Sequence, residues 1–278
     1  MNEELTQAQQ QELWQRLRKA ELDCSRAIAY QECLNTISAH VLHYHGQKQG
    51  YDIDHYWSND RDDLMYSFGH RSKASVVRYF HGMNQMMRQA KTRYFAEKYP
   101  DRIQNTPEFD GVGDYCIHAI FCPHIQVAGD GKTAVGCFHA PAICSELGVT
   151  GKQEPSGEWG GYGVNFRLET DGRWRIWQIQ QLGGGGFDIG EDVIDNTNRP
   201  NPPYPPVAEE LRAARGEASI TPEPNFTVRD RGPLTRYRVA AIEPEMQEPY
   251  DTWDDSLTYL RDYDVHEYYA DKEGKQDG

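Results

Sequence analysis

The sequence predicts an α+β fold in which amino-terminal helices pack against a curved antiparallel sheet. Apolar residues recur at spacings of mostly three and four between residues 6 and 44, which is typical of one long amphipathic helix. Between residues 114 and 177, strand-like segments are separated by Gly-Asp and Asp-Gly turns, and Asp-Gly is among the strongest short hairpin signals. Helices followed by consecutive strands are typical of the α+β class.

Helical segments fill the first part of the chain. The first helix is expected to end before Gly46, and a short helix is expected at residues 52–58. A short strand at residues 63–68 follows, and Ser72 is placed to cap a third helix. These elements precede the main sheet and would cover one of its faces.

Four consecutive antiparallel strands are expected after the helices. Their predicted ranges are residues 115–127, 133–140, 159–168 and 173–180. Pro123 lacks a backbone N–H, so it is expected to force a bulge or an edge in the first of them. The run Gly183-Gly-Gly-Gly186 is interpreted as a flexible corner after the last strand.

The chain of 278 residues is long enough for one domain with a substantial extension. A domain is expected at residues 1–182, with its core at 25–182. The Gly/Pro-rich stretch 183–278, with one short helix at 207–215, is expected to pack on that domain or on a neighbouring subunit.

Charge and composition exclude several classes of partner. The net charge of −14 argues against nucleic acid and against anionic membranes, because both require a basic patch. No run of about 18 apolar residues exists, and the amino terminus has neither a basic region nor an apolar core, so a cytoplasmic protein is expected. The six cysteines show no C-x-x-C spacing and are interpreted as reduced core residues.

A set of residues along the strands resembles a known family pattern. It comprises His118, Pro123, Ile125, Val127, Gly129-Asp130, Ala134, Tyr162 and Asp171-Gly172-Arg-Trp174-Arg-Ile176. This pattern resembles the SnoaL-like branch of the nuclear-transport-factor-2-like superfamily, over about residues 25–182. The resemblance implies a cone-shaped fold and a homodimer or homotrimer.

Enzymes of that superfamily include polyketide cyclases, scytalone dehydratase, steroid isomerases and the bile-acid dehydratase. In the dehydratases a histidine on the first long strand acts as acid or base, and His118 matches it. They also draw a tyrosine and an aspartate from the end of the first helix, where this chain has the stretch 40–45 and no aspartate. Gln178 and Gln180 stand where an arginine or a histidine is common.

The residues themselves indicate a catalytic site inside the cone. Strand alternation directs His118 toward the apolar interior, and helical spacing directs His40 and Tyr44 toward it from the opposite wall. His139 is a further candidate, at the end of its strand. Because histidine titrates near neutrality, the predicted function is a cofactor-independent lyase or isomerase that dehydrates its substrate or shifts a double bond.

Aromatic side chains are expected to line the site and to bind a hydrophobic, ring-containing substrate such as a polyketide, phenolic or steroid-like compound. The predicted lining residues are Trp57, Phe68, Phe138, Tyr162, Asn165 and Trp177. Any one of the aromatic residues could equally be ordinary core.

Two alternatives remain open. The same fold could serve as a non-catalytic module that binds a small molecule or a protein. Histidines could instead bind a transition metal, through His40, His43, His45, His118 and His139. The absence of H-x-E and H-E-x-x-H spacings argues against metal, and no cofactor is expected.

Overall fold

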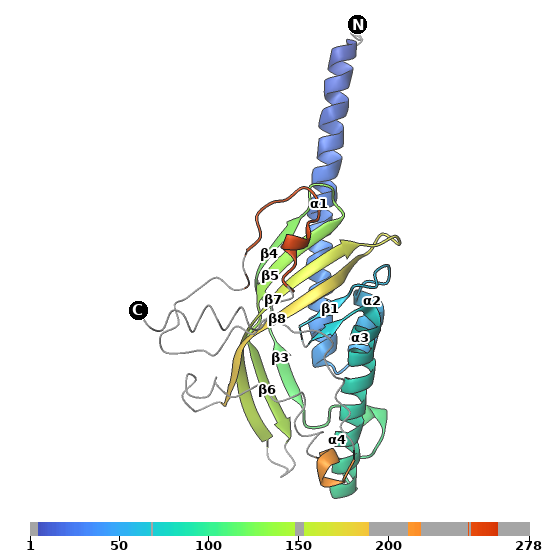
Figure 1. The fold of residues 1–278 in the computed structure, drawn as a ribbon, viewed down its shortest axis with the longest axis vertical. Helices are drawn as coiled ribbons and strands as arrows, with labels where there is room; N and C mark the ends of the chain where they lie inside the picture. Colours follow the sequence, from blue (N-terminus) through green and yellow to red (C-terminus); the bar gives the residue numbers. More distant parts are fainter. Residues whose placement is uncertain are drawn as a thin grey trace, which may run out of the picture.

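The computed structural model describes residues 5–67, 69–147, 153–188, 211–217, 244 and 246–260. It is an α+β structure in which one very long helix lies against a curved, mostly antiparallel sheet, with the shorter helices beside them (Figure 1). This is the predicted fold class.

The long helix α1 spans Gln7–His45 without a break. Thr6 caps it: its hydroxyl accepts a hydrogen bond from the Gln9 N–H, while the Gln9 side chain accepts one from the Thr6 N–H, so two orphan donors are satisfied. Gly46 ends the helix and donates to the Leu42 carbonyl. Apolar periodicity therefore located both ends to within about one residue.

The other helices are shorter than α1. They are α2 (Gln49–Tyr56), α3 (Lys73–Val77), a π-helical turn η1 (Arg78–Met83), α4 (Asn84–Lys98), and the short η2 (Pro107–Phe109) and η3 (Asp255–Leu257). Ser72 does cap α3, because its hydroxyl accepts from the Ser75 N–H. Of the helix expected at residues 207–215, residues 211–214 are helical and residues 207–210 lie outside the described residues.

The described residues form an eight-stranded sheet. Its strands are β1 (Met65–Tyr66), β2 (His70–Arg71), β3 (Tyr115–His118), β4 (Phe121–Val127), β5 (Thr133–His139), β6 (Ala142–Leu147), β7 (Gln153–Leu168) and β8 (Trp174–Asp188). The order is β2-β1-β8-β7-β5-β4. β7 pairs with β5 along one half and with β6 along the other, and β3 pairs with β6. Every pair is antiparallel except β1 with β8.

Three features of the sheet differ from the prediction or refine it. The expected first strand is divided into β3 and β4, and the bulge expected at Pro123 is confirmed by a register shift between Phe121 and His124. β6 was not predicted. The reading of the four-glycine run as a flexible corner is wrong, because it lies within β8, where Gly183 pairs with Gly160 and Gly186 pairs with Glu158. Glycines carry no side-chain signal, so only the partner strand reveals this stretch as sheet.

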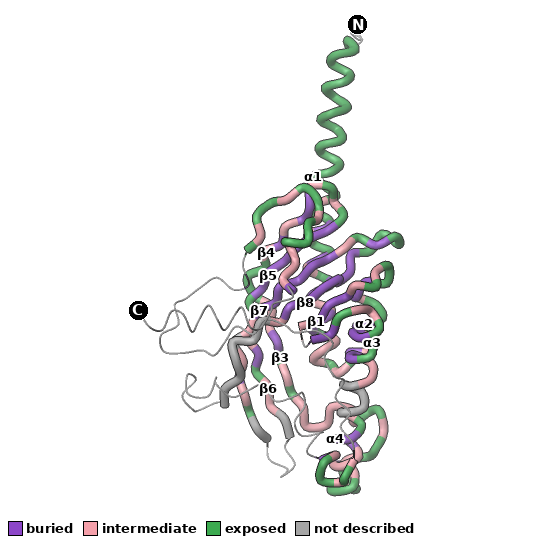
Figure 2. Tube along the Cα trace, in the orientation of Figure 1, coloured by how far each residue is buried: buried purple, intermediate pink, exposed green. Residues whose placement is uncertain are grey.

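The hydrophobic core lies where α1 crosses the sheet (Figure 2). Cys33 and Ile37 of α1 are fully buried against Phe166 and Ile176 of the sheet, and Trp57 after α2 is fully buried as well. The buried side of α1 begins at about residue 29, so the helix enters the body only in its second half. The residues of this half include the predicted site residues of α1.

The segment 246–260 covers the other face of the sheet. Gly129 and Asp130 donate to the carbonyls of Tyr250 and Asp251, and the ring of Trp253 lies 4.7 Å from that of Trp177. The sheet therefore has α1 on one face and part of the extension on the other.

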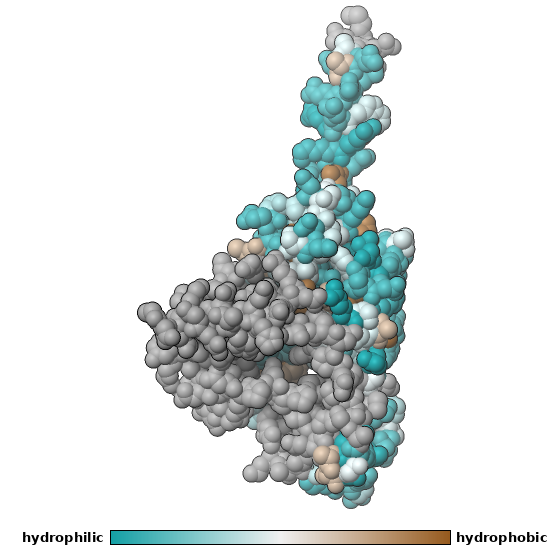
Figure 3. All heavy atoms as spheres, viewed as in Figure 1, coloured by the Kyte–Doolittle hydropathy of each residue, from teal (hydrophilic) through white to brown (hydrophobic). Residues whose placement is uncertain are grey.

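No helix in the described part of the chain is both long and apolar enough to cross a membrane. The surface of α1 seen in Figure 3 is mainly hydrophilic.

Candidate functional site

His118 lies at the end of β3 and meets the last turn of α1. Its imidazole is buried and lies 5.8 Å from the ring of His45 and 5.7 Å from the ring of Tyr44. The backbone N–H of His118 donates to Nε2 of His45. This hydrogen bond and the two ring contacts position β3 against α1.

Burial keeps His118 neutral. Together with the smaller effects of the neighbouring His45 and His40, burial lowers the pKa of His118 to about 4. Burial also lowers the pKa of His45, with His40 as the second cause. At neutral pH the His118 imidazole can therefore accept a proton or donate a hydrogen bond.

A buried carboxylate fixes the orientation of His40. Oδ2 of Asp52, on α2, accepts from Nδ1 of His40 at 2.7 Å and from Nε1 of Trp57 at 3.1 Å. The exposed fractions of the three residues are 3% for His40, 1% for Asp52 and 0% for Trp57. The carboxylate holds the proton of a neutral His40 on Nδ1, which leaves the lone pair on Nε2.

The end of the first helix carries no aspartate. The structure supplies it from α2, where Asp52 is the acidic residue of the first turn. The other oxygen of Asp52, Oδ1, has no hydrogen-bond partner among the described residues. A signal was present in the sequence, because Asp52 stands beside Ile53 and near Trp57 in a segment predicted to be buried.

Glu158, on β7, faces the same space as His118. Across the sheet His118 pairs with Ala142 of β6, and Ala142 pairs with Glu158 of β7. Residues paired across antiparallel strands point to the same face of the sheet, so the His118 imidazole and the Glu158 carboxyl lie on either side of the Ala142 methyl group. Two strand spacings separate the backbones of His118 and Glu158, which is about 10 Å. Burial raises the pKa of Glu158 to about 7, so near neutrality it is partly protonated.

Tyr162 completes the group from β7. It lies four residues after Glu158 on the same face, and burial raises the pKa of its phenol well above the usual range, with Tyr44 and Glu158 as further causes. The phenol therefore stays protonated and can donate a hydrogen bond. We name the set His40, Tyr44, His118, Glu158 and Tyr162 the inner cluster.

Several predicted site residues lie elsewhere. Phe138 is buried in the core, but Trp177 packs on Trp253, and Nδ2 of Asn165 donates to the Leu257 carbonyl. Trp177 and Asn165 thus face the extension rather than α1. The bulge in β8 turns Trp177 outward, because it is the extra residue between two paired positions. Phe68 lies outside the described residues.

Two of the predicted histidines also point away from the inner cluster. His139 is exposed, and its neighbour Phe138 faces the core, so strand alternation sends the imidazole to the opposite face. Nδ1 of His43 bonds to the Ala39 carbonyl at 2.7 Å, and its ring stacks on Tyr51. The five histidines considered as metal ligands therefore do not converge.

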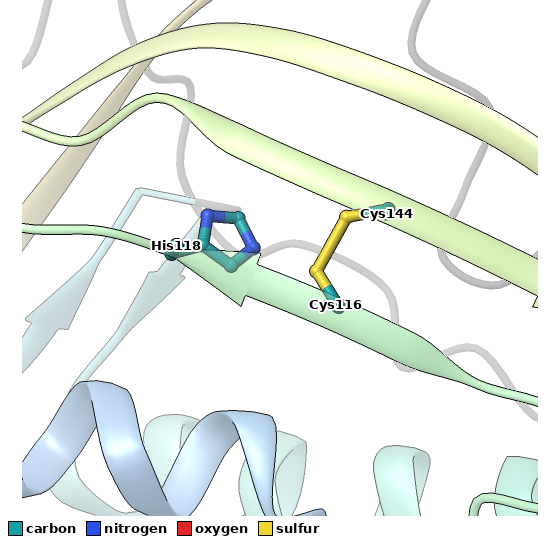
Figure 4. Close-up of side chains that lie close together, drawn as sticks. All are labelled: Cys116, His118 and Cys144. Carbon is teal, nitrogen blue, oxygen red and sulfur yellow. A yellow bond between two sulfur atoms is a disulfide. The ribbon is translucent and has the colours of Figure 1, made fainter.

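A disulfide lies beside His118 (Figure 4). Cys116 of β3 and Cys144 of β6 are paired directly across the strands, with Cα atoms 4.1 Å apart. The reading of all six cysteines as reduced core residues is therefore wrong for these two. It is also wrong for Cys24 and Cys122, which are exposed.

The remaining two cysteines, Cys33 and Cys137, are buried as expected. The ligand atoms of Cys116, His118 and Cys144 lie within 4.8 Å of one another. Because the two sulfurs are bonded to each other, neither is a thiolate, and we assign no metal ligand here.

Two cavities lie among the described residues at places away from the inner cluster. One, of about 420 Å³, lies between α1 and β4 and is bordered by Arg26, Tyr30 and Ile125. The other, of about 450 Å³, lies beside α4 and includes Arg93 and Arg212.

No family model and no curated protein matches the chain. Solved structures to which it is similar include a protein from Novosphingobium aromaticivorans provisionally named a scytalone dehydratase, at 10% identity and a TM-score of 0.43, covering 61% of this chain and 93% of that one. ActVI-ORFA from Streptomyces coelicolor has 12% identity and a TM-score of 0.36, and the match covers 56% of this chain and 96% of that one. An NTF2-like superfamily protein from Salmonella enterica has 12% identity and a TM-score of 0.39, and the match covers 60% of this chain and 98% of that one.

The α+β class and the mostly antiparallel sheet described above are those that the sequence predicted. Identities and TM-scores this low carry no argument about a reaction.

Proposed function

We propose that the inner cluster catalyses proton transfer at carbon, either a dehydration or a double-bond shift, without a cofactor. The observation that carries this proposal is the row His118, Ala142 and Glu158, in which burial shifts two titratable groups in opposite directions. Burial favours the neutral imidazole and the neutral carboxyl. A base and an acid are thus both available near neutral pH, on either side of a small residue.

In the dehydration, the imidazole of His118 takes a proton from carbon while Glu158 gives its proton to the departing hydroxyl. The C–H and C–O bonds break, a carbon–carbon double bond forms, and water leaves. A base with a pKa of about 4 is weak by itself. The pair passes, however, from two neutral groups to an imidazolium and a carboxylate, whose attraction in a water-poor site favours the transfer.

The remaining residues of the inner cluster orient the substrate. The bond from Asp52 holds His40 in one tautomer, so Nε2 of His40 can accept a hydrogen bond from a hydroxyl of the substrate. Tyr162 keeps its proton and can donate to a carbonyl or a developing enolate. Tyr44, which packs edge-on against His118, would restrict the orientation of that imidazole.

The surroundings favour an apolar substrate with a ring. His40 lies edge-on to Phe80 and Trp57, both fully buried. The net charge of −14 would repel a polyanion. A polyketide, phenolic or steroid-like compound that is uncharged or weakly anionic fits both constraints.

A non-catalytic binding or interaction module of the same fold is the second candidate. It is favoured by the position of these two cavities, which lie away from the inner cluster. Such a module would bind ring compounds without changing them.

The test is a spectral screen of aromatic and polyketide-like β-hydroxy ketones for loss of water, with His118→Ala, Glu158→Gln and a control, His124→Ala. His124 lies on β4 and bonds to Gln126, outside the inner cluster. We expect each cluster variant to lower kcat by about 10²- to 10⁴-fold and the control to retain activity. Binding without turnover would support the module, and undiminished turnover by His118→Ala would refute the mechanism.

A further inference from the structure

The first half of α1 projects beyond the rest of the described structure (Figures 1 and 2). Residues 5–25 are all exposed, and the first residue of α1 that is buried is Ala29. In proteins most of the stability of a helix comes from tertiary packing of one of its faces. A further contact would therefore stabilise the projecting part of α1.

Apolar residues on this segment follow a heptad pattern. Leu13, Leu17, Ala20 and Cys24 are separated by four, three and four residues, which is the spacing of the a and d positions of a coiled coil. Leu13 is 54% exposed and Leu17 is 44% exposed. We call these four residues the heptad face.

The heptad face is turned away from the sheet. The body-facing side of α1 is marked by Ala29 and Cys33, which are buried, and by Arg26, whose Nη2 donates to the Val127 carbonyl at 2.9 Å. At 3.6 residues per turn, the heptad face lies about half a turn from that side. A partner helix can thus pack on it without displacing the sheet.

Charges on the same segment favour a second copy of the chain as the partner. In a parallel, in-register pair of helices, the residue at position g of one helix contacts the residue at position e of the next heptad in the partner helix. Here position g is Arg16 and position e is Glu21, so the pair forms two Arg16–Glu21 contacts, one on each side of the seam. Residues 7–28 carry four basic and three acidic side chains, whereas the whole chain carries a net charge of −14. Two copies of this segment would therefore not repel each other as the rest of the surface would.

We propose that the heptad face pairs with the same face of a second copy, as a parallel two-stranded coiled coil that makes the protein a homodimer. Each copy then places its sheet and its shorter helices on the outer side of the helix pair, near the carboxyl end of its own α1. The proposal is independent of the chemistry assigned to the inner cluster.

Sedimentation velocity of the full chain tests the pairing. We expect a dimer at micromolar concentration, and a double variant, Leu13→Glu with Leu17→Glu, whose dimer dissociation constant is at least about 100-fold higher. Leu22→Glu is the matched control, because Leu22 lies on the body-facing side near Gly131 and should leave the dimer intact. A monomeric parent protein, or a double variant that dimerises like the parent, would overturn the proposal.

The register has its own test in charge reversal. Arg16→Glu should weaken the dimer, and adding Glu21→Arg should restore it, because the two opposite charges are then exchanged across the seam. Failure of the second change to rescue the first would overturn the parallel register.

Cross-linking tests the same register directly. In the parallel pair the two Cys24 residues occupy one a layer, so the azo oxidant diamide should join them, taking two protons and two electrons from the thiols. The experiment uses a Cys122→Ser background, which removes the other exposed free cysteine among the described residues. We expect a covalent dimer that Cys24→Ser abolishes, and a dimer in sedimentation that gives no cross-link would contradict the parallel arrangement.

Discussion

Replacing Asp52 with alanine should destabilise the protein strongly through two buried donors. Nδ1 of His40 and Nε1 of Trp57 both donate to Oδ2 of Asp52, and the two residues are 3% and 0% exposed. The substitution leaves both N–H groups without an acceptor in a site that water does not readily reach. Each such group costs about 1–3 kcal/mol, so the free energy of unfolding should fall by about 2–6 kcal/mol.

Urea unfolding followed by circular dichroism measures this cost, and α2 offers a matched control. Asp54 also bonds to a histidine, His81, at 2.9 Å, but these side chains are 55% and 40% exposed. Asp54→Ala should therefore change the free energy of unfolding by no more than about 1 kcal/mol. Asp52→Asn should cost less than Asp52→Ala, because the amide oxygen can still accept one of the two bonds.

An equal, small loss in Asp52→Ala and Asp54→Ala would refute the reasoning. It would mean that water enters the site and solvates the two donors, so that His40 is not held in one tautomer. The m-value must stay constant across the variants for the comparison to hold.

Three further outcomes are expected. Glu158 has a folded-state pKa of about 7, above its ordinary 4.5, so the folded protein binds more protons between these pH values and stability falls as pH rises through them; Glu158→Gln should remove that fall in urea titrations from pH 4.5 to 7.5. For His118 the sign is opposite, because its folded-state pKa of about 4 lies below its ordinary 6.5, so stability is lost as pH falls from 6.5 to 4, and His118→Asn should flatten that loss in acid titrations. Reducing the Cys116–Cys144 bond, which closes a loop with a sequence separation of 28, should cost about 3–4 kcal/mol in urea melts with and without a dithiol, and a variant with both cysteines changed to serine should not respond to the dithiol.

Local patterns predicted much of the fold. The ends of α1 and the direction of His40 and Tyr44 follow from a period that is uninterrupted along the helix. The bulge near Pro123 follows from its missing N–H group. In each case the information lies within a few residues of the feature that it predicts.

What the sequence did not predict depends on partners far along the chain. Glu158 lies near His118 because β6, which was not predicted, pairs with both of their strands and places Ala142 between the two residues. Asp52 acquired its role from a histidine twelve residues earlier, on another helix. Trp177 was expected to line the site as an aromatic residue of the last strand, but the bulge in β8 places it on the opposite face.

The proton states of Glu158 and His118 test the central claim most directly. Heteronuclear NMR of the full chain, with ¹³C-labelled glutamate and ¹⁵N-labelled histidine, can follow both side chains across pH, and Glu158→Gln and His118→Asn assign the signals. We predict that the Glu158 carboxyl titrates near pH 7 and that the His118 imidazole stays neutral from pH 8 down to about 5. A Glu158 carboxylate that is already ionised at pH 5, or a His118 imidazole that takes up its proton above pH 6, would contradict the account.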